Sequence, residues 1–123
     1  MLKFLPLALA AAAVLAVGLP AAAAPGGQAC FRLSSIENTK MQGERTLFMR
    51  SSTGAYYRMD FGSDCTNAGS ETLVLHPTNN SDEVCGAIGI DVHVRATGQG
   101  CIPTNISRLT PDEVAAIPAS DKP

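Results

Sequence analysis

The sequence predicts a mainly β protein: a small antiparallel barrel or sandwich of about six strands, with a short C-terminal helix and two disulfides. Three observations predict this class. Short runs of β-branched and aromatic residues alternate apolar with polar side chains and are separated by clusters of Gly, Asn, Ser and Pro. The chain holds four cysteines, an even number, behind an apolar leader. Near the C-terminus, one segment carries the Thr-x-x-Glu pattern that begins a helix.

Residues 1–24 have the composition of a signal peptide. A lysine near the start is followed by an apolar run over residues 5–17, and Pro20 then precedes a string of small residues. The run is shorter than the stretch of about 20 residues that crosses a membrane. Gly27 stands where a lipoprotein carries a large aliphatic residue, so lipidation of Cys30 is disfavoured. We therefore expect a protein of the periplasm or a secreted protein, with no membrane attachment after cleavage.

The mature chain has the length of one domain. We assign residues 25–29 to a flexible leader, residues 30–118 to a single β-domain with a terminal helix, and residues 119–123 to a frayed tail. Without Lys3 of the predicted signal peptide, eight basic residues stand against eleven acidic ones, and the arginines are scattered. This weak acidity without a basic patch argues against a nucleic-acid partner. A core this small is marginally stable, so covalent cross-links are expected.

The four cysteines predict two structural disulfides. Their positions, Cys30, Cys65, Cys85 and Cys101, lack the close Cys-x-x-Cys pairs of zinc sites and of thioredoxin-like redox centres. Three pairings are open. We favour Cys65 with Cys85, which flank one predicted strand, and Cys30 with Cys101, which open the first and last strands. A bridge between Cys30 and Cys65 would instead mean that the first strand pairs with the hairpin. On the loop-entropy model each bridge adds at most roughly 3 to 5 kcal/mol of stability.

Strands follow from alternation and from turn residues. The predicted strands cover residues 30–36, 45–51, 55–61, 71–76, 84–95 and 101–109. The second and third form a hairpin, in which Tyr57, Met59 and Phe61 share the inner face while Tyr56, Arg58 and Asp60 share the outer one. We expect a turn at Gly43, loops at 66–70 and 77–83, a bend at Gly86 and Gly89, and an edge or bulge at Pro103.

The segment after the last strand predicts a short helix. Thr110 is a favourable N-cap, and Glu113 completes the capping box. Pro118 ends the helix after about two turns. Val114 and Ile117, three residues apart, lie on one face and are expected to dock on the wall of the barrel or across its open end.

The polar side chains of the strand over 84–95 form one row. Asp91, His93 and Arg95 alternate with apolar residues, and a carboxylate beside an imidazole is the minimum for acid–base chemistry. No Gly-x-Ser-x-Gly nucleophile motif is present, and the cysteines are assigned to disulfides. We therefore favour the solvated face of a strand over an enzyme that uses Asp91 and His93. His76 and His93, seventeen residues apart, are weak evidence for a metal site, so we predict no metal and no cofactor.

Tyr56 and Arg58 are the other candidates for a contact surface, because Tyr and Arg are enriched at binding hot spots. Together with Asp91, His93 and Arg95 they form the predicted binding surface. The favoured function is a structural or binding role, with an unidentified partner such as another protein of the cell envelope. The alternative is an inhibitor or ligand of an envelope hydrolase that uses the loop at 77–83 as a wedge.

The chain also resembles a family of small exported four-cysteine proteins of Gram-negative bacteria that is known only as a domain of unknown function. The resemblance rests on "ACFR", on "RTLFMR" followed by "YYRMDF", on Cys65, Cys85 and Cys101, and on "ISRLTPDEVAAI". These pieces span most of the mature chain. An acidic residue soon after the third cysteine is common in the family, whereas here Asp91 comes six residues after Cys85. The resemblance implies a fold and an exported location, and it carries no activity.

Overall fold

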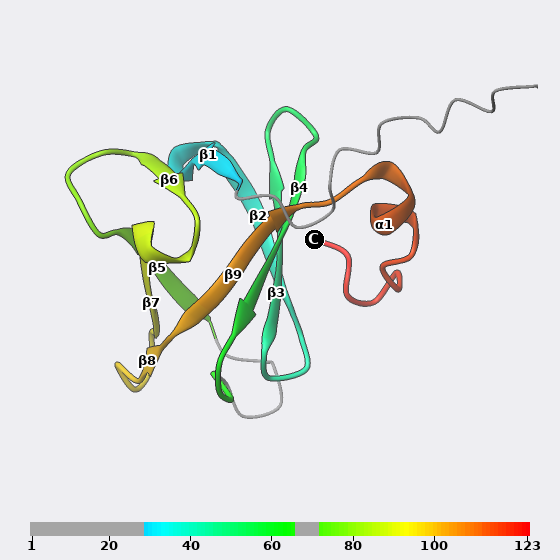
Figure 1. Cartoon of the computed structure of the whole chain (residues 1–123). Coiled ribbons are helices and arrows are strands. Elements are labelled where there is room, and N and C mark those ends of the chain that lie inside the picture. The colour runs from blue at the N-terminus through cyan, green and yellow to red at the C-terminus, as the bar shows by residue number, and fades with distance from the viewer. Residues whose placement is uncertain (1–28, 66–71) are drawn as a thin grey trace, which may run out of the picture.

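The computed structural model describes residues 29–65 and 72–123 (Figure 1). The predicted signal peptide, most of the predicted leader and the predicted loop at 66–70 lie outside the described residues. Ala29, assigned to the leader, is buried, and its carbonyl accepts a hydrogen bond of 3.1 Å from the Gly86 N–H. Ala29 therefore packs as part of the domain and not as part of a flexible leader.

The described residues form nine strands in three antiparallel sheets, followed by one short helix. The four-stranded sheet has the order β2 (Ile36–Gln42), β3 (Thr46–Ser51), β4 (Tyr56–Phe61) and β9 (Pro103–Arg108). The three-stranded sheet has the order β5 (Leu73–Pro77), β7 (Ile90–Val94) and β8 (Gly100–Cys101). The remaining pair is β1 (Cys30–Arg32) with β6 (Glu83–Cys85), and the helix is α1 (Pro111–Ala115). The predicted class, mainly β with antiparallel sheets and one short C-terminal helix, is confirmed. None of the helices in this part of the chain is long and apolar enough to span a membrane.

Two predicted strands are each broken by a 3-10 turn. The segment at 30–36 contains β1 and the turn Leu33–Ser35 before β2 begins, and the segment at 84–95 contains β6, the turn Ala87–Gly89 and β7. Gly86 has a φ of 75°, a conformation that other residues rarely adopt, and it ends β6. The bend predicted at Gly86 is therefore confirmed, but it separates two strands that belong to different sheets.

The β3–β4 hairpin supplies the centre of the core. Tyr57, Met59 and Phe61 of β4 are buried, as predicted, and Leu47 and Met49 of β3 pack beside them. Pro103 pairs with Phe61 at a shift in the β4–β9 register, which confirms the irregularity expected there.

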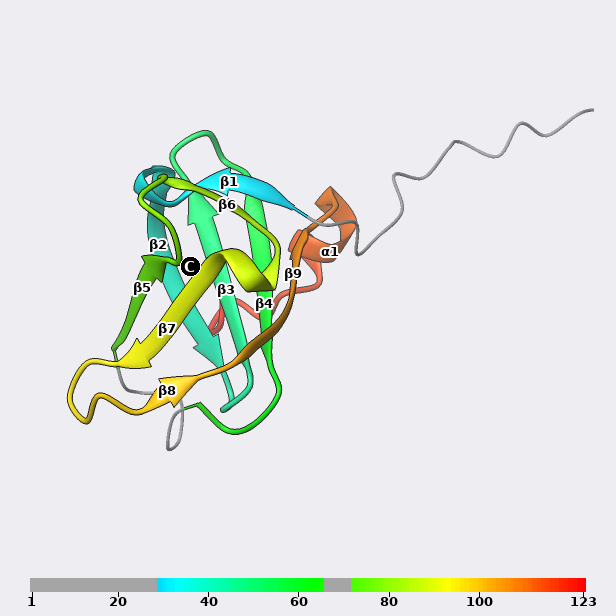
Figure 2. The same ribbon diagram turned by 60° about the vertical axis from the view of Figure 1, so that its left-hand side comes forward.

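The two larger sheets continue into each other through the chain between β8 and β9. Figure 2 shows β7 in front of the four-stranded sheet and β8 at its lower end, with β9 curving from β8 up beside β4. The β1–β6 pair lies across one end, where the Phe31 ring packs on the Tyr57 ring at 4.8 Å between centroids. The strands enclose one core, but among the described residues β2 and β5 pair on one side only, so the barrel is not closed.

The predicted disulfide pairing is wrong. Two disulfides are present, but they join Cys30 to Cys85 and Cys65 to Cys101. β1 pairs with β6, and this register places Cys30 directly opposite Cys85. The prediction failed because it treated β1 as a neighbour of the last strand and β6 as part of β7.

Helix α1 covers the outer face of the four-stranded sheet. Thr110 and Glu113 form the predicted capping box. Ile117 is buried against Phe48 and Leu109, and Val114 packs on the same cluster, so the predicted docking face is confirmed. In the segment expected to fray, the Asp121 carboxylate accepts a hydrogen bond of 3.1 Å from the Gln42 amide.

Candidate functional site

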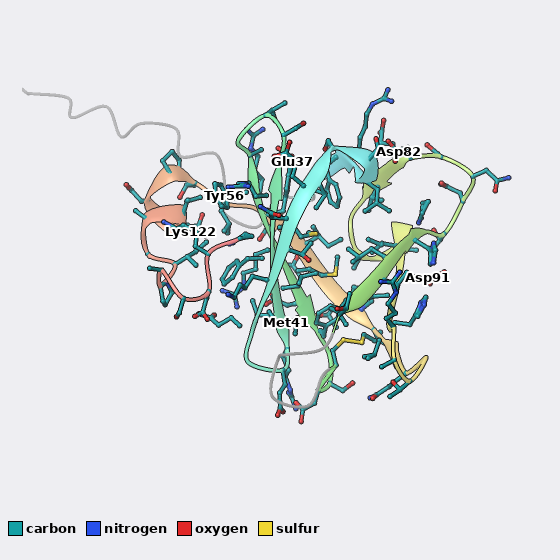
Figure 3. All side chains as sticks on the ribbon, turned by 180° about the vertical axis from the view of Figure 1, so that it is seen from behind. Glu37, Met41, Tyr56, Asp82, Asp91 and Lys122 are labelled. Carbon is teal, nitrogen blue, oxygen red and sulfur yellow. A yellow bond between two sulfur atoms is a disulfide. The ribbon has the colours of Figure 1, made fainter. Side chains whose placement is uncertain are left out.

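The five residues of the predicted binding surface do not form one surface. Tyr56 packs against the cluster under α1, and Arg58 forms an ion pair of 2.9 Å with Asp60. Asp91 and His93 lie on the outer face of β7, in the other large sheet. Figure 3 shows Tyr56 beside α1 and Asp91 on the opposite side of the molecule. A single contact surface that contains both groups is therefore absent.

The outer face of β5 and β7 brings the two histidines together. The predicted alternation is confirmed, because Val92 and Val94 are buried while Asp91 is exposed. His76 lies opposite Asp91 in the strand register, and the rings of His76 and His93 stack with centroids 5.6 Å apart. Spacing in the sequence could not indicate this contact, since it depends on the pairing of β5 with β7.

Metal-ligating side chains converge in one other place. Among the described residues, the one group of three such side chains whose ligand atoms lie close together is Cys30, Glu83 and Cys85. Both sulfur atoms of that group are joined in a disulfide, so they do not offer thiolate ligands.

The most distinctive feature is an open groove between β2 and β5, which we call the seam. It has a volume of about 350 Å³. Its lining residues are Leu33, Ile36, Thr39, Thr72, Leu73, Val74, Leu75 and Arg95. Figure 3 views the molecule from the side on which β2 and β5 face each other, with Met41 labelled near the end of β2.

Inward-facing side chains at the seam remain accessible to solvent. Leu73 and Leu75 pair with the buried Val94 and Val92, so they point to the inner face of their sheet, yet both are only half-buried. Thr39 pairs with Met49, which is fully buried, and is itself exposed. Inward-facing residues of the interior strands are buried because a further strand covers them. Among the described strands, none covers the seam.

On β5, backbone groups of the seam residues point into the groove. In an antiparallel ladder, successive residues direct their N–H and C=O alternately towards the neighbouring strand and away from it. The Arg95 N–H donates to the Thr72 carbonyl at 2.9 Å, so Thr72 faces the β7 side. Leu73 and Leu75 consequently direct their backbone groups away from β7, towards the seam.

The backbone groups of β2 alternate in the same way, and some of them also point into the groove. The Ser51 N–H donates to the Ala55 carbonyl at 2.8 Å, so Ser51 and, two residues earlier, Met49 bond towards β4. Met49 therefore does not bond to Thr39, its register partner on β2. Thr39 and Met41 direct their backbone groups away from β3, as Leu73 and Leu75 do from β7. The two edges thus present backbone donors and acceptors on both sides of the groove.

Arg95 lines one end of the seam. It was predicted to share a binding row with Asp91 and His93. Its backbone N–H donates to the carbonyl of Thr72, just before β5, and the residue also lines the seam. The ion pairs within the described ranges join Arg45 to Asp64 at 2.7 Å and Arg58 to Asp60, so Arg95 has no acidic partner there. In the described part of the chain, the seam therefore combines aliphatic side chains and two threonines with one positive charge that lacks an acidic partner.

The loop at 77–83, which was predicted to insert into a hydrolase, is fixed by hydrogen bonds at both ends. The Thr78 hydroxyl donates to the Ile88 carbonyl at 3.1 Å, and the Ser81 N–H donates to the Asn79 side chain at 2.9 Å. At the far end, the Asp82 carboxylate accepts hydrogen bonds from the hydroxyl and the N–H of Ser34. These two hydrogen bonds lower the pKa of Asp82 below its usual value, and the bond from the Ser34 hydroxyl has the larger effect.

No family model matches the sequence, and no curated protein and no solved structure matches it either.

Proposed function

We propose that this chain is an exported, non-enzymatic domain that binds a protein partner in the periplasm or outside the cell. Two disulfides in a small β-domain support an oxidising compartment. The apolar run over residues 5–17, which has the composition of a signal peptide, supports export.

The seam is the observation that carries the binding role. Folding normally covers inward-facing aliphatic side chains, because each buried CH₂ group stabilises by about 0.8 kcal/mol. Leu73 and Leu75 forgo part of that stabilisation while they line an open groove. A partner that fills the groove would recover it, and this makes the seam a better candidate than the outer faces of the sheets.

A second candidate is inhibition of an envelope hydrolase through the loop at 77–83. The hydrogen bonds at Thr78, Ser81 and Asp82 favour it, because a loop that is ordered before binding loses less conformational entropy when it enters a cleft. Asn79 and Asn80 are exposed at its tip.

Affinity capture from envelope extract tests both candidates. The bait is the mature domain with both disulfides intact, compared with Leu75→Glu in the seam, Asn80→Lys in the loop and Ile88→Glu as a control. Ile88 is an aliphatic residue that is 92% exposed and lies outside the seam. We expect a specific protein that is retained by the Ile88 and Asn80 variants and lost with Leu75→Glu. Loss with Asn80→Lys alone would favour the hydrolase ligand, and the absence of any specific protein would contradict the proposal.

A further inference from the structure

We infer that the seam binds one extended segment of a partner polypeptide, which adds as a β-strand between β2 and β5. This inference rests on the proposed binding function and names its mode and the chemistry of its ligand. The segment carries aliphatic side chains at alternate positions and an acidic group at the end that lies beside Arg95.

The backbone of the seam supports strand addition. Thr39 and Met41 on one side, and Leu73 and Leu75 on the other, offer N–H and C=O groups that the two sheets leave unpaired. An extended chain has donors and acceptors along both of its edges and can bond to both strands at once. A helix satisfies its own backbone groups and leaves those of the seam unbonded.

The side chains of the seam set the pattern of the ligand. Alternate residues of a strand point to the same face. One face of the added strand would contact Leu73, Leu75 and Ile36, which form an apolar surface on the inner side of the groove. The other face would point to solvent, as does His76, which is exposed on the outer side of β5. The ligand should therefore alternate aliphatic with polar residues.

The positive charge of the seam predicts the charge at one end of the ligand. Among the residues that the structure describes, Arg95 is the one charged residue that lines the groove, and it lies opposite the start of β5. A carboxylate at that end would pair with its guanidinium, whereas a lysine there would be repelled.

Both edges also carry features that protect against uncontrolled strand pairing. The register between Ile36 and Asn38 is irregular, Lys40 is exposed on β2, and β5 ends at Pro77. These features shorten the stretch that is available for pairing. They favour a short ligand and disfavour open-ended association between copies of this chain.

The test uses synthetic peptides and the mature, disulfide-bonded domain. The probe is an acetylated peptide of alternating threonine and valine that ends in aspartate. One control peptide has the same residues with the valines grouped together, and a second ends in lysine. We expect the alternating peptide to bind at least about tenfold more tightly than either control in calorimetry. Arg95→Glu should reverse the preference between aspartate and lysine, and Arg95 is exposed, so this change leaves the core intact.

Amide hydrogen exchange measured by NMR distinguishes strand addition from contact by side chains alone. The bound peptide should slow exchange at Thr39, Met41, Leu73 and Leu75, and should leave Ile106 of β9 unchanged. Leu75→Glu should abolish binding, while Ile88→Glu should not, with circular dichroism confirming that both variants are folded.

Three other outcomes would overturn the inference, and they distinguish failure of the binding mode from failure of the proposed function. Equal affinity for the alternating and grouped peptides, or unchanged exchange on the edges, rules out strand addition, while the proposed function stands if partner capture still depends on Leu75. A concentration-dependent dimer that Leu75→Glu abolishes would make a second copy the occupant. Loss of both peptide binding and partner capture would remove the proposed function as well.

Discussion

His76 and His93 stack on each other across β5 and β7, with ring centroids 5.6 Å apart. Their side chains lie on the outer face of the sheet, where His76 is exposed and His93 is half-buried. The contact therefore covers little apolar surface compared with the valines on the inner face of β7, Val92 and Val94, which are buried.

We expect His93→Ala to change the free energy of unfolding by no more than about 0.5 kcal/mol, as is usual for surface substitutions. Val94→Ala on the opposite face, which is 0% exposed, should cost about 2 kcal/mol because it leaves a cavity. Urea unfolding at neutral pH measures both. A cost above about 2 kcal/mol for His93→Ala would mean that the outer face of β7 is covered in solution.

Each disulfide closes a long loop, and we expect each to be essential to the stability of the fold. The bridges span 55 residues from Cys30 to Cys85 and 36 residues from Cys65 to Cys101. On the loop-entropy model, the double variant Cys30→Ala/Cys85→Ala should lose at most about 4 kcal/mol of unfolding free energy, and Cys65→Ala/Cys101→Ala should lose a similar amount. Peptide mapping of unreduced protein checks the pairing. A linked peptide containing Cys30 and Cys101 would contradict the structure.

Below pH 5 we expect stability to fall in part through Asp82. Hydrogen bonds from Ser34 hold the pKa of Asp82 below its usual value. A carboxylate whose pKa is lowered by folding stabilises the protein above its unfolded pKa of about 4, and this contribution disappears as the pH falls through the lower folded pKa. Ser34→Ala should therefore flatten the pH dependence in this acid range, whereas Ser52→Ala, at an exposed serine, should not. Parallel profiles for Ser34→Ala and the unchanged protein would show that the Ser34–Asp82 bond does not persist in solution.

Alternation in the sequence was sufficient to predict the inner and outer faces of single strands. Tyr57 and Met59 are buried while Arg58 between them is exposed, and this follows from a period of two. The helix could also be predicted from neighbouring residues alone, because the Thr110 cap and Glu113 lie three residues apart.

The disulfide pairing and the seam depend on which strands are neighbours, and this is not a local property. A 3-10 turn separates β1 from β2, and Gly86 separates β6 from the strand that follows it. Because of these two breaks β1 can pair with β6, and this pairing brings Cys30 to Cys85. Arg95 lines the seam only because β5 pairs with β7 and leaves its other edge open. Hydrophobic pattern assigns a face to each residue, but it does not say which strand edge stays unpaired.

The last prediction concerns the docking of α1. The Thr110 side chain accepts a hydrogen bond from the Glu113 N–H, so Thr110→Ala should cost about 1 kcal/mol, or roughly 4 to 8 °C in melting temperature for a domain of this size. Val114→Asp should cost more, because it introduces a charge into the apolar contact with Phe48, Leu109 and Ile117. Truncation after Leu109 should cost most, since it uncovers Phe48, which is 4% exposed in the complete fold. Thermal unfolding followed by circular dichroism ranks the three variants. An unchanged melting temperature after truncation would mean that α1 is undocked in solution, leaving Phe48 as an exposed apolar site available to a partner.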